Sequence, residues 1–589
     1  MKKNRRETRE FQVYKEQLKN IQNVISNTKV ANLWTHEAAV RKKLKALNEM
    51  QGDGIKGFST VQKEYRNLLD EISKKFLEDY NKKNNTNFLF EQIIKEHEKE
   101  YVSSGLIPVL VTHHIPKMVT EEFAHYLPAD PKDEYSETRG EKRTIILHLG
   151  ETNTGKTYQA IERMKECNNG IYLAPLRILA LEIYERLSED GVLCNLRTGE
   201  EEIITDGARH ESATVEKLEL EQEYEVAVID EIQMIGDSQR GAAWTRALLG
   251  IRCPEIHVCG AYNAKELLIE IIESCGDEYE IKEYVRAVPL QIEPEPFHLN
   301  DAREGDALIV FSKKRVLEVA KLYKEQKIGT SMIYGDLPPE VRKLQYHAFV
   351  EGKSKVLVST DAIGMGVNLP IRRIVFMNIK KFDGEEVRYL TSQEVKQIGG
   401  RAGRKGIYEI GYVAVMGEQY DFIREKIEKE DPHLEKAVIG PSEVLLKMKG
   451  LPLREKIALW STREEQMDMY RKMDVRDYIF ILDKIRTYKL EEKAEWKLMR
   501  LPFDVHNEKV FSCFIEYVEQ YFIRKSKILS KPIYDDTTLE AYETYYQKVN
   551  LYYSFSKNFR IPFEEEWVYE ERIRISESIN QKLQYSIVE

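Results

Sequence analysis

Short apolar runs alternate with helical stretches through the middle of the 589-residue chain. Between residue 144 and about residue 295, the runs lie at 144–149, 171–174, 225–229 and 256–259. A second set lies at 307–311, 355–359, 372–376 and 411–415. Alternation of this kind is typical of a mostly parallel sheet with crossover helices. The pattern therefore predicts two consecutive α/β blocks.

The regions that flank these blocks follow a helical pattern. The clearest example is a stripe of apolar residues at helical spacing between Val61 and Tyr80. Polar, breaker-rich stretches at 127–142 and 293–306 are expected to act as linkers. We therefore expect four parts, which are a helical region at 1–140, α/β domains at 141–295 and 296–420, and a helical region at 421–589.

Composition places the chain among globular proteins, with 42% hydrophobic residues and no apolar run near the ~18 residues that cross a bilayer. We expect no membrane association. Its six cysteines have no metal-ligand spacing, and its start carries Glu7, Glu10 and Glu16, unlike an acid-poor transit peptide. We therefore expect a cytoplasmic protein.

The net charge is −10, yet residues 1–50 carry 12 Lys and Arg against 5 Asp and Glu. That start is either a nucleic-acid arm or a solvated helix face.

A glycine-rich loop follows the first strand-like run, TIILHLG. Strand, glycine loop and helix in this order form a phosphate-binding loop, because the backbone N–H groups can surround a polyphosphate. We expect Lys156 to reach the β- and γ-phosphates and the Thr157 hydroxyl to hold Mg²⁺. The predicted phosphate-binding residues are Gly150, Thr152, Asn153, Thr154, Gly155, Lys156 and Thr157.

Two adjacent acids, Asp230 and Glu231, end the apolar run EVAVID and begin the next segment. Most such pairs are surface charge, but this pair follows a strand some way after a phosphate loop. At that spacing the Asp230 carboxylate can hold Mg²⁺ through its water shell, and Glu231 can polarise an attacking water. We therefore predict a catalytic role for Glu231 and a metal-binding role for Asp230.

The second block ends in the string QIGGRAGR, which contains Gln397, Arg401 and Arg404. The planar fork of an arginine matches phosphate oxygens, so two arginines in a glycine-rich frame suit recognition of a γ-phosphate. The alternative is a basic helix end, which the glycines make less attractive. We predict that all three residues take part in catalysis.

Taken together, these strings resemble superfamily-two helicases, and most closely the mitochondrial degradosome RNA helicase family of the suppressor-of-var type, whose bacterial relatives share the motor. The resemblance covers residues from about 144 to 420. Besides GETNTGKT, DEIQM and QIGGRAGR, it is carried by APLRILALEI (174–183), SATVE (212–216), YGDLPPEVRKLQYHAF (334–349) and TDAIGMGVNLPIRRIVF (360–376). The chain departs from the family pattern at Glu151, where Pro is usual, and at Ala261, where Glu is common.

The resemblance implies an α/β fold with two tandem RecA-like domains, whose parallel sheets with crossover helices are flanked by helical terminal regions. It implies that ATP and Mg²⁺ bind between these domains, with Gly366 as a further ATP-binding residue. It also implies contacts with a nucleic-acid strand at Pro175, Arg177, Thr214 and Thr360. The family suggests 3′-to-5′ movement on RNA, unwinding of duplexes in RNA turnover, and an exoribonuclease or other RNA-decay partner.

Two other functions remain open, because such a motor contacts the nucleic-acid backbone rather than the bases. One is a DNA helicase or translocase, and the other is a nucleic-acid-stimulated ATPase that remodels RNA–protein complexes. The aromatic segment at 542–560 could stack bases, although its helical spacing favours packing. His113 and His114 lack cysteines or acids at metal-ligand spacing, so the sequence predicts no metal there.

Overall fold

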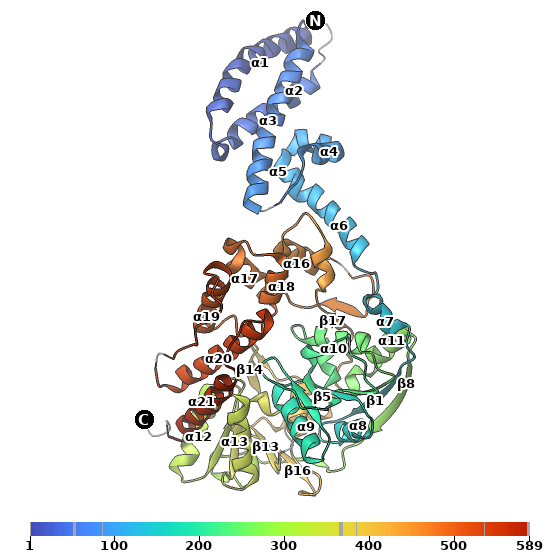
Figure 1. Ribbon diagram of the computed structural model, residues 1–589, viewed down its shortest axis with the longest axis vertical. Helices are drawn as coiled ribbons and strands as arrows, with labels where there is room; N and C mark the ends of the chain where they lie inside the picture. Colours follow the sequence, from blue (N-terminus) through green and yellow to red (C-terminus); the bar gives the residue numbers. More distant parts are fainter. Residues whose placement is uncertain are drawn as a thin grey trace. The chain divides into compact units, whose positions relative to one another are not determined.

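The structure is a computed structural model that describes residues 2–50, 55–84, 86–364, 369–383, 386–463, 465–534 and 536–585. The chain forms two compact units. One contains Met1–Ala129 and Pro441–Arg463, and the other contains Asp130–Gly440 and Glu464–Glu589 (Figure 1). Predicted residue Gly366 lies outside the described residues.

The first unit is helical, as expected. In α3 the predicted stripe is confirmed, because the buried face includes Tyr65, Leu69 and Ile72. A π-helical turn at Leu110–His114 joins the last two helices of the N-terminal part. The helices are α1 (Lys2–Asn27), α2 (Trp34–Glu49), α3 (Phe58–Asn84), α4 (Phe90–Ser104), α5 (Leu106–Val109), α6 (Ile115–Tyr126) and α16 (Leu453–Thr462).

The second unit begins with an eight-stranded sheet in the order β4-β3-β5-β2-β6-β7-β1-β8. Its strands pair in parallel except for β3 with β4. The strands are β1 (Thr144–Gly150), β2 (Gly170–Ala174), β3 (Cys194–Arg197), β4 (Glu202–Ile203), β5 (His210–Thr214), β6 (Val226–Ile229), β7 (Glu255–Gly260) and β8 (Glu278–Tyr284). The accompanying helices are α7 (Ser136–Arg139), α8 (Lys156–Lys165), α9 (Arg177–Glu189), α10 (Gly241–Gly250) and α11 (Lys265–Cys275).

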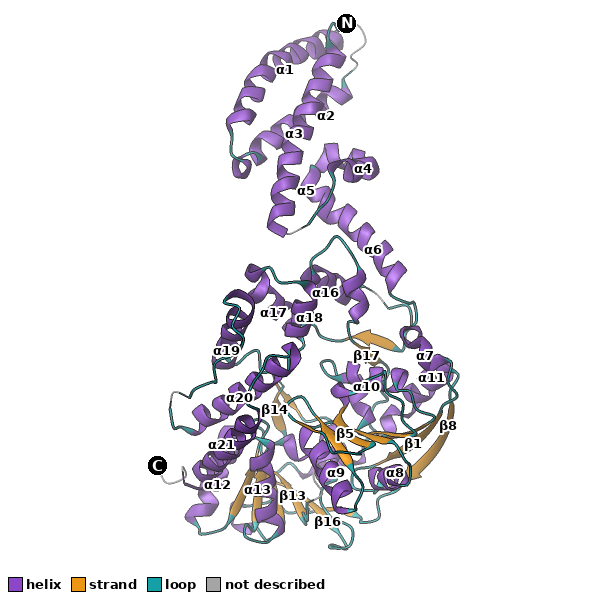
Figure 2. Ribbon diagram, in the orientation of Figure 1, coloured by secondary structure: helices purple, strands orange, loops and turns teal. Residues whose placement is uncertain are grey.

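A six-stranded parallel sheet follows, in the order β11-β12-β10-β13-β16-β9. Its strands are β9 (Leu290–Ile292), β10 (Asp306–Ile309), β11 (Thr330–Ile333), β12 (Val356–Ser359), β13 (Arg373–Phe376) and β16 (Gly411–Val415), and β14 (Lys380–Phe382) pairs with β15 (Val387–Tyr389). Its helices are α12 (Lys313–Glu325), α13 (Pro339–Val350), α14 (Ser392–Gly399) and α15 (Tyr420–Glu428). The predicted α/β class with two mostly parallel sheets is confirmed (Figure 2). Because β9 belongs to the second sheet, that sheet starts before the predicted boundary at 295 and 296.

The C-terminal helices of this unit pack on the second sheet domain. Glu543 of α20 binds Lys313 and accepts a hydrogen bond from the Tyr334 hydroxyl at 2.6 Å. Tyr545, Tyr546, Tyr552 and Tyr553 of α20 are buried, so these tyrosines serve packing rather than base stacking. The elements are β17 (Ala437–Ile439), β18 (Tyr470–Lys472), α17 (Arg476–Ile485), α18 (Glu492–Met499), α19 (Glu508–Val518), α20 (Leu539–Phe559) and α21 (Glu565–Tyr585). Across the described residues, no helix combines the length and apolar character needed to span a membrane.

Candidate functional site

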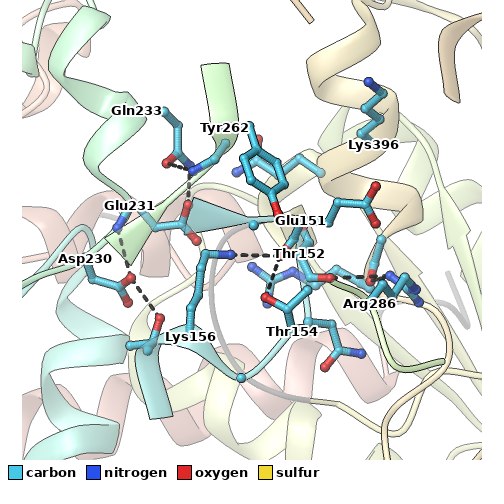
Figure 3. Close-up of a pocket in the computed structure, with 18 of the residues that line it drawn as sticks. Glu151, Thr152, Thr154, Lys156, Asp230, Glu231, Gln233, Tyr262, Arg286 and Lys396 are labelled. Carbon is cyan, nitrogen blue, oxygen red and sulfur yellow. Dashed lines mark hydrogen bonds between the residues drawn. The ribbon is translucent and has the colours of Figure 1, made fainter. Parts of the chain in front are cut away.

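A cavity of about 890 Å³ lies between the two sheets of the second unit. The loop between β1 and α8 forms one wall, and the end of α14 forms the opposite wall. Figure 3 shows Lys156, Asp230 and Glu231 on the first wall, with Lys396 on a helix of the other. The lining includes most of the predicted site residues, namely Gly150, Thr152, Asn153, Thr154, Gly155, Lys156, Thr157, Asp230, Glu231, Gln397 and Arg401.

The phosphate loop has the backbone that its glycines predict. A Cβ on Gly150 would lie 2.6 Å from the Tyr284 carbonyl oxygen, so only glycine fits there. Gly155 has a left-handed φ of +83° and caps the N-terminus of α8, where backbone N–H groups favour an anion. The Lys156 ammonium donates to the Glu151 carbonyl at 2.8 Å, which keeps the cation folded over the loop. The loop is therefore built to surround a polyphosphate.

The Asp230 carboxylate lies beside this loop and accepts hydrogen bonds from two hydroxyl groups. The Thr157 hydroxyl donates to Asp230 Oδ1 at 3.0 Å, and the Tyr172 hydroxyl donates to Asp230 Oδ2 at 2.9 Å. Burial and the adjacent Glu231 raise the pKa of Asp230 to about 6. A divalent cation would reverse that shift, because positive charge favours the carboxylate. Hard oxygen ligands at this position fit Mg²⁺.

Glu231 is held in position by its own sequence motif. It has a left-handed backbone with a φ of 49° and lies between β6 and the short helix that begins at Ile232. The Gln233 amide donates to the Glu231 carboxylate, and its oxygen accepts from the Ala261 N–H at 3.2 Å. Gln233 therefore links the acid to the segment after β7. Gln233 belongs to the string DEIQM, whose local pattern indicates the two acids but not this role of the glutamine.

The second wall brings arginines toward the first sheet domain. Arg401 lines the cavity, and its guanidinium donates to the Gly364 carbonyl at 2.6 Å. Arg404 does not line the cavity. The positive charges of both Arg401 and Arg404 nevertheless stabilise the ionised form of Glu182 on α9. Burial raises the pKa of Glu182, and the positive charges of Arg186, Arg401 and Arg404 oppose this rise. Both predicted arginines therefore face the helix that follows β2.

Arg286 connects the two walls, and it is absent from the residues that the sequence predicts for the site. Its guanidinium donates to the Thr152 carbonyl at 3.4 Å, to the Gly400 carbonyl at 2.7 Å, and to the Ala402 carbonyl. Nearby, the Asn153 amide donates to the Gly403 carbonyl at 3.1 Å. Burial lowers the pKa of Arg286. Arg286 follows β8 in a segment without a recognisable motif, so only the three-dimensional contacts reveal it.

Three of the residues predicted to contact nucleic acid lie at the carboxyl ends of parallel β-strands. Pro175 comes directly after β2, and Thr214 ends the adjacent β5, so both lie at the same sheet edge. Thr360 comes directly after β12 of the second sheet and is 7% exposed. The Pro175 carbonyl accepts from Arg240 at 2.6 Å. Such carboxyl edges are where open α/β sheets bind ligands.

Arg177 occupies a different environment from an exposed phosphate contact. Its side chain is 10% exposed and lies 2.6 Å from Glu200, 3.0 Å from Glu201 and 3.0 Å from Glu340. It also donates to the Tyr546 hydroxyl at 2.9 Å. These carboxylates already pair with the guanidinium that would have to contact a phosphate of a nucleic-acid strand.

A phosphate loop and paired acids on one RecA-like domain, facing arginines on a second, define a superfamily-two helicase. Residues 131–284 match the model of the DEXQ-box helicase domain of Suv3, residues 293–406 the helicase conserved C-terminal domain, and residues 539–584 the ATP-dependent RNA helicase SUV3 C-terminal domain. The chain belongs to the SUV3 family, as the resemblance of its motifs had indicated.

The relatives include a mitochondrial SUV3 helicase of Oryza sativa subsp. japonica, which is 34% identical over 427 residues covering 70% of this chain and 73% of that protein. The SUV3 helicase of Saccharomyces cerevisiae is 40% identical over 53% of this chain and 45% of its own length. The chain thus spans about half the length of the yeast relative. DExH16 of Arabidopsis thaliana is 41% identical over 54% of this chain and 56% of that protein.

The expectation of a cytoplasmic protein is wrong by this comparison, because these relatives are named mitochondrial. That expectation depended on six scattered cysteines and on three acidic residues near the first position of the chain. A few charges in one segment are a weak guide to location, and the family similarity outweighs them.

Proposed function

We propose that this chain is an ATP-dependent RNA helicase that hydrolyses ATP in the cavity between its two RecA-like domains. The observation that carries the proposal is the pairing of walls, with Lys156, Thr157, Asp230 and Glu231 on one and Gln397 and Arg401 on the other. The names of its relatives, which are ATP-dependent RNA helicases, support the same activity.

In the proposed reaction, the loop N–H groups and Lys156 hold the β- and γ-phosphates of ATP. Glu231, oriented by Gln233, accepts a proton from the water that attacks the γ-phosphorus. The bond to the bridging oxygen then breaks, and ADP and phosphate leave. Arg401 and Arg404 neutralise the charge of the transferring group, and Gln397 helps to position it. Thr157 and Asp230 would hold Mg²⁺, which supplies positive charge at the phosphates.

We further propose that a single strand crosses the carboxyl edges of both sheets, with contacts at Pro175, Thr214 and Thr360. Opening and closing of the nucleotide cavity would move this strand in the 3′-to-5′ direction. Contacts with the backbone give little sequence preference and a salt-dependent affinity. The two domains proposed for this cycle are those predicted at 141–295 and 296–420. Strand β9 (Leu290–Ile292) is moved from the first domain to the second, because it pairs with β16.

The direct test uses four tailed duplexes, with an RNA or a DNA loading strand and a 3′ or a 5′ overhang. Unwinding of the 3′-tailed RNA duplex that requires hydrolysable ATP is the expected result. Preference for the DNA loading strand would establish the alternative of a DNA helicase. Stimulated ATP turnover without strand separation would instead favour an ATPase that remodels RNA–protein complexes.

A role in RNA turnover requires a partner that cleaves the separated strand, and an exoribonuclease would provide that chemistry. The expected result is that the chain and a 3′-to-5′ exoribonuclease degrade a structured RNA faster together than the exoribonuclease does alone. The matched control is Glu231→Gln, which binds ATP and RNA without turnover. Equal acceleration by this variant would contradict coupling to ATP hydrolysis.

A further inference from the structure

Three potential metal ligands converge in the helical N-terminal unit. The ligand atoms of Glu96, His97 and His114 all lie within 4.8 Å of one another. Glu96 Oε2 is 3.8 Å from His97 Nε2 and 3.7 Å from His114 Nδ1. The two histidines are largely buried, whereas the Glu96 side chain is 40% exposed. The site is therefore at the surface, with both imidazoles turned inward.

The backbone is irregular at both histidines. Successive residues of an α-helix point about 100° apart, so Glu96 and His97 could not share one ion in a regular helix. At His97, however, α4 has a kink with a φ of −131° and a ψ of 39°. His114 ends the π-helical turn Leu110–His114, and such turns occur frequently at functional sites. These two irregularities aim the imidazoles at the same carboxylate oxygen.

Both inward-facing nitrogens lack the partners that buried polar atoms normally have. His97 Nε2 and His114 Nδ1 are buried, and no hydrogen-bond partner for either is present among the described residues. An unsatisfied buried polar atom destabilises the folded chain, so it needs an explanation such as a bound ion. Glu96 Oε2, at 3.8 Å from His97 Nε2 and 3.7 Å from His114 Nδ1, is too distant from both for a hydrogen bond.

We propose that Glu96, His97 and His114 bind a zinc-type divalent cation. Two imidazoles and one carboxylate are a common ligand set for Zn²⁺. Bonds of ~2.0–2.1 Å place tetrahedral ligands about 3.3 Å apart, so a small side-chain rotation closes this cluster on an ion. The fourth position is open to water or to His113, whose exposed ring lies 5.8 Å from that of His97. The adjacency of Glu96 and His97 is why metal-ligand spacing in the sequence did not reveal the site.

Lys117 is the group that opposes metal binding. Its ammonium lies 3.2 Å from Glu96 Oε2 and is 49% exposed, so it occupies the carboxylate that the ion would need. Binding of a cation therefore requires Lys117 to swing into solvent. The bound ion would join α4 to the π-helical turn before α6 and fix the kink at His97. Its role is structural, and it does not depend on the proposed helicase activity.

The test measures Zn²⁺ binding to the full, untagged chain after chelator treatment, with excess Mg²⁺ present to suppress binding at the nucleotide site. We expect one Zn²⁺ per chain, and Co²⁺ at the same site should give the visible absorption of a tetrahedral ion. His97→Ala and His114→Ala should each weaken Zn²⁺ binding at least about tenfold. His125→Ala, which removes an exposed histidine of α6, should leave it unchanged.

Lys117→Ala should have the opposite effect and strengthen Zn²⁺ binding. This result would not be expected if His97 and His114 only packed within the helical unit. Circular dichroism and ATP turnover identify any variant that fails to fold. If a histidine variant fails, Glu96→Gln replaces it, because this side chain is partly exposed. Binding that survives the ligand substitutions, or that is absent from the full chain, would overturn the proposal.

Discussion

The Arg177 guanidinium lies 3.0 Å from the Glu340 carboxylate, which joins helix α9 of the first sheet domain to helix α13 of the second. The Tyr546 hydroxyl of α20 donates to the same carboxylate at 2.7 Å. One arginine thus connects three parts of the second unit. Because Glu182, on the same helix α9, faces Arg401 and Arg404, this contact lies close to the cavity proposed to bind ATP.

We expect Arg177→Ala to destabilise the chain more than it weakens RNA binding. Removing the guanidinium leaves Glu200, Glu201 and Glu340 without the cation that contacts all three. The loss should be about 2–3 kcal/mol, below the ~3–5 for a fully buried pair because these carboxylates are partly exposed. Chemical denaturation measures the stability, and RNA titration at several salt concentrations measures the affinity.

The matched control for this substitution is Arg315→Ala, since the Arg315 side chain is 67% exposed and contacts only a neighbour on its own helix among the described ion pairs. It should leave stability nearly unchanged. A large loss of RNA affinity in Arg177→Ala, with a salt slope reduced by about 1 and unchanged stability, would instead support the strand contact predicted from the sequence.

Lys156→Ala should reduce ATP turnover by about 10²–10³-fold and weaken ATP binding. The ammonium is held over the phosphate loop by the Glu151 carbonyl, so it is already positioned for charge that develops on the phosphates. Steady-state hydrolysis and nucleotide titration measure the two effects. Lys142→Ala is the control, because Lys142 is 78% exposed. Full turnover in Lys156→Ala would contradict the phosphate-loop assignment.

Asp230→Asn should stabilise the metal-free chain while it abolishes turnover. The pKa of Asp230 rises from 3.8 to about 6, so its ionised form is disfavoured in the folded state. The stability that the protonated acid provides is complete below pH ~4 and is lost as the pH rises through about 6. At pH 7.5 the penalty is up to about 3 kcal/mol, and asparagine avoids it.

Thermal denaturation with a chelator present measures this effect at two pH values. The variant should unfold at a higher temperature than the natural chain at pH 7.5, and the difference should shrink near pH 4. Added Mg²⁺ should stabilise the natural chain more than the variant, because the cation favours the carboxylate. Equal stability of the two chains at pH 7.5 would mean that the Asp230 carboxylate is not destabilised by burial.

The strands that the sequence revealed are those with continuous apolar runs. β1 and β16 are buried along most of their length, so hydrophobicity alone indicates them. In contrast, β5 is buried but contains His210, Glu211 and Ser212, and its polar side chains hide it. β8 is an edge strand with the sequence EYEIKEY and exposed charges. Pairing with neighbouring strands, rather than local composition, therefore determines that β5 and β8 are strands.

The site divides in the same way between local and distant contacts. The phosphate loop and the paired acids are short strings whose chemistry depends on adjacent residues, so they were predictable. Arg286 depends on partners 134, 114 and 116 residues away, and no local pattern encodes them. Arg177 fits a motif of the family, but its burial depends on Glu340 and Tyr546, which lie far along the chain.

Arg286→Ala should lower the rate of ATP turnover more than it weakens ATP binding. The guanidinium joins the phosphate loop to the carbonyl groups around Arg401, so its loss should loosen the closed arrangement that catalysis needs. Lysine should not restore turnover, because an ammonium cannot span the carbonyls that the planar guanidinium reaches. Measurements of kcat and KM for the alanine and lysine variants separate these effects.

The control for Arg286 is Arg303→Ala, which removes an exposed arginine from the segment before β10. It should leave both kcat and KM unchanged. We expect kcat to fall at least about tenfold in Arg286→Ala, because misplacement of groups far from the reacting atoms can cost up to ~10²-fold. If kcat is retained and only KM rises, Arg286 serves ATP binding alone, and the two walls of the cavity meet without its help.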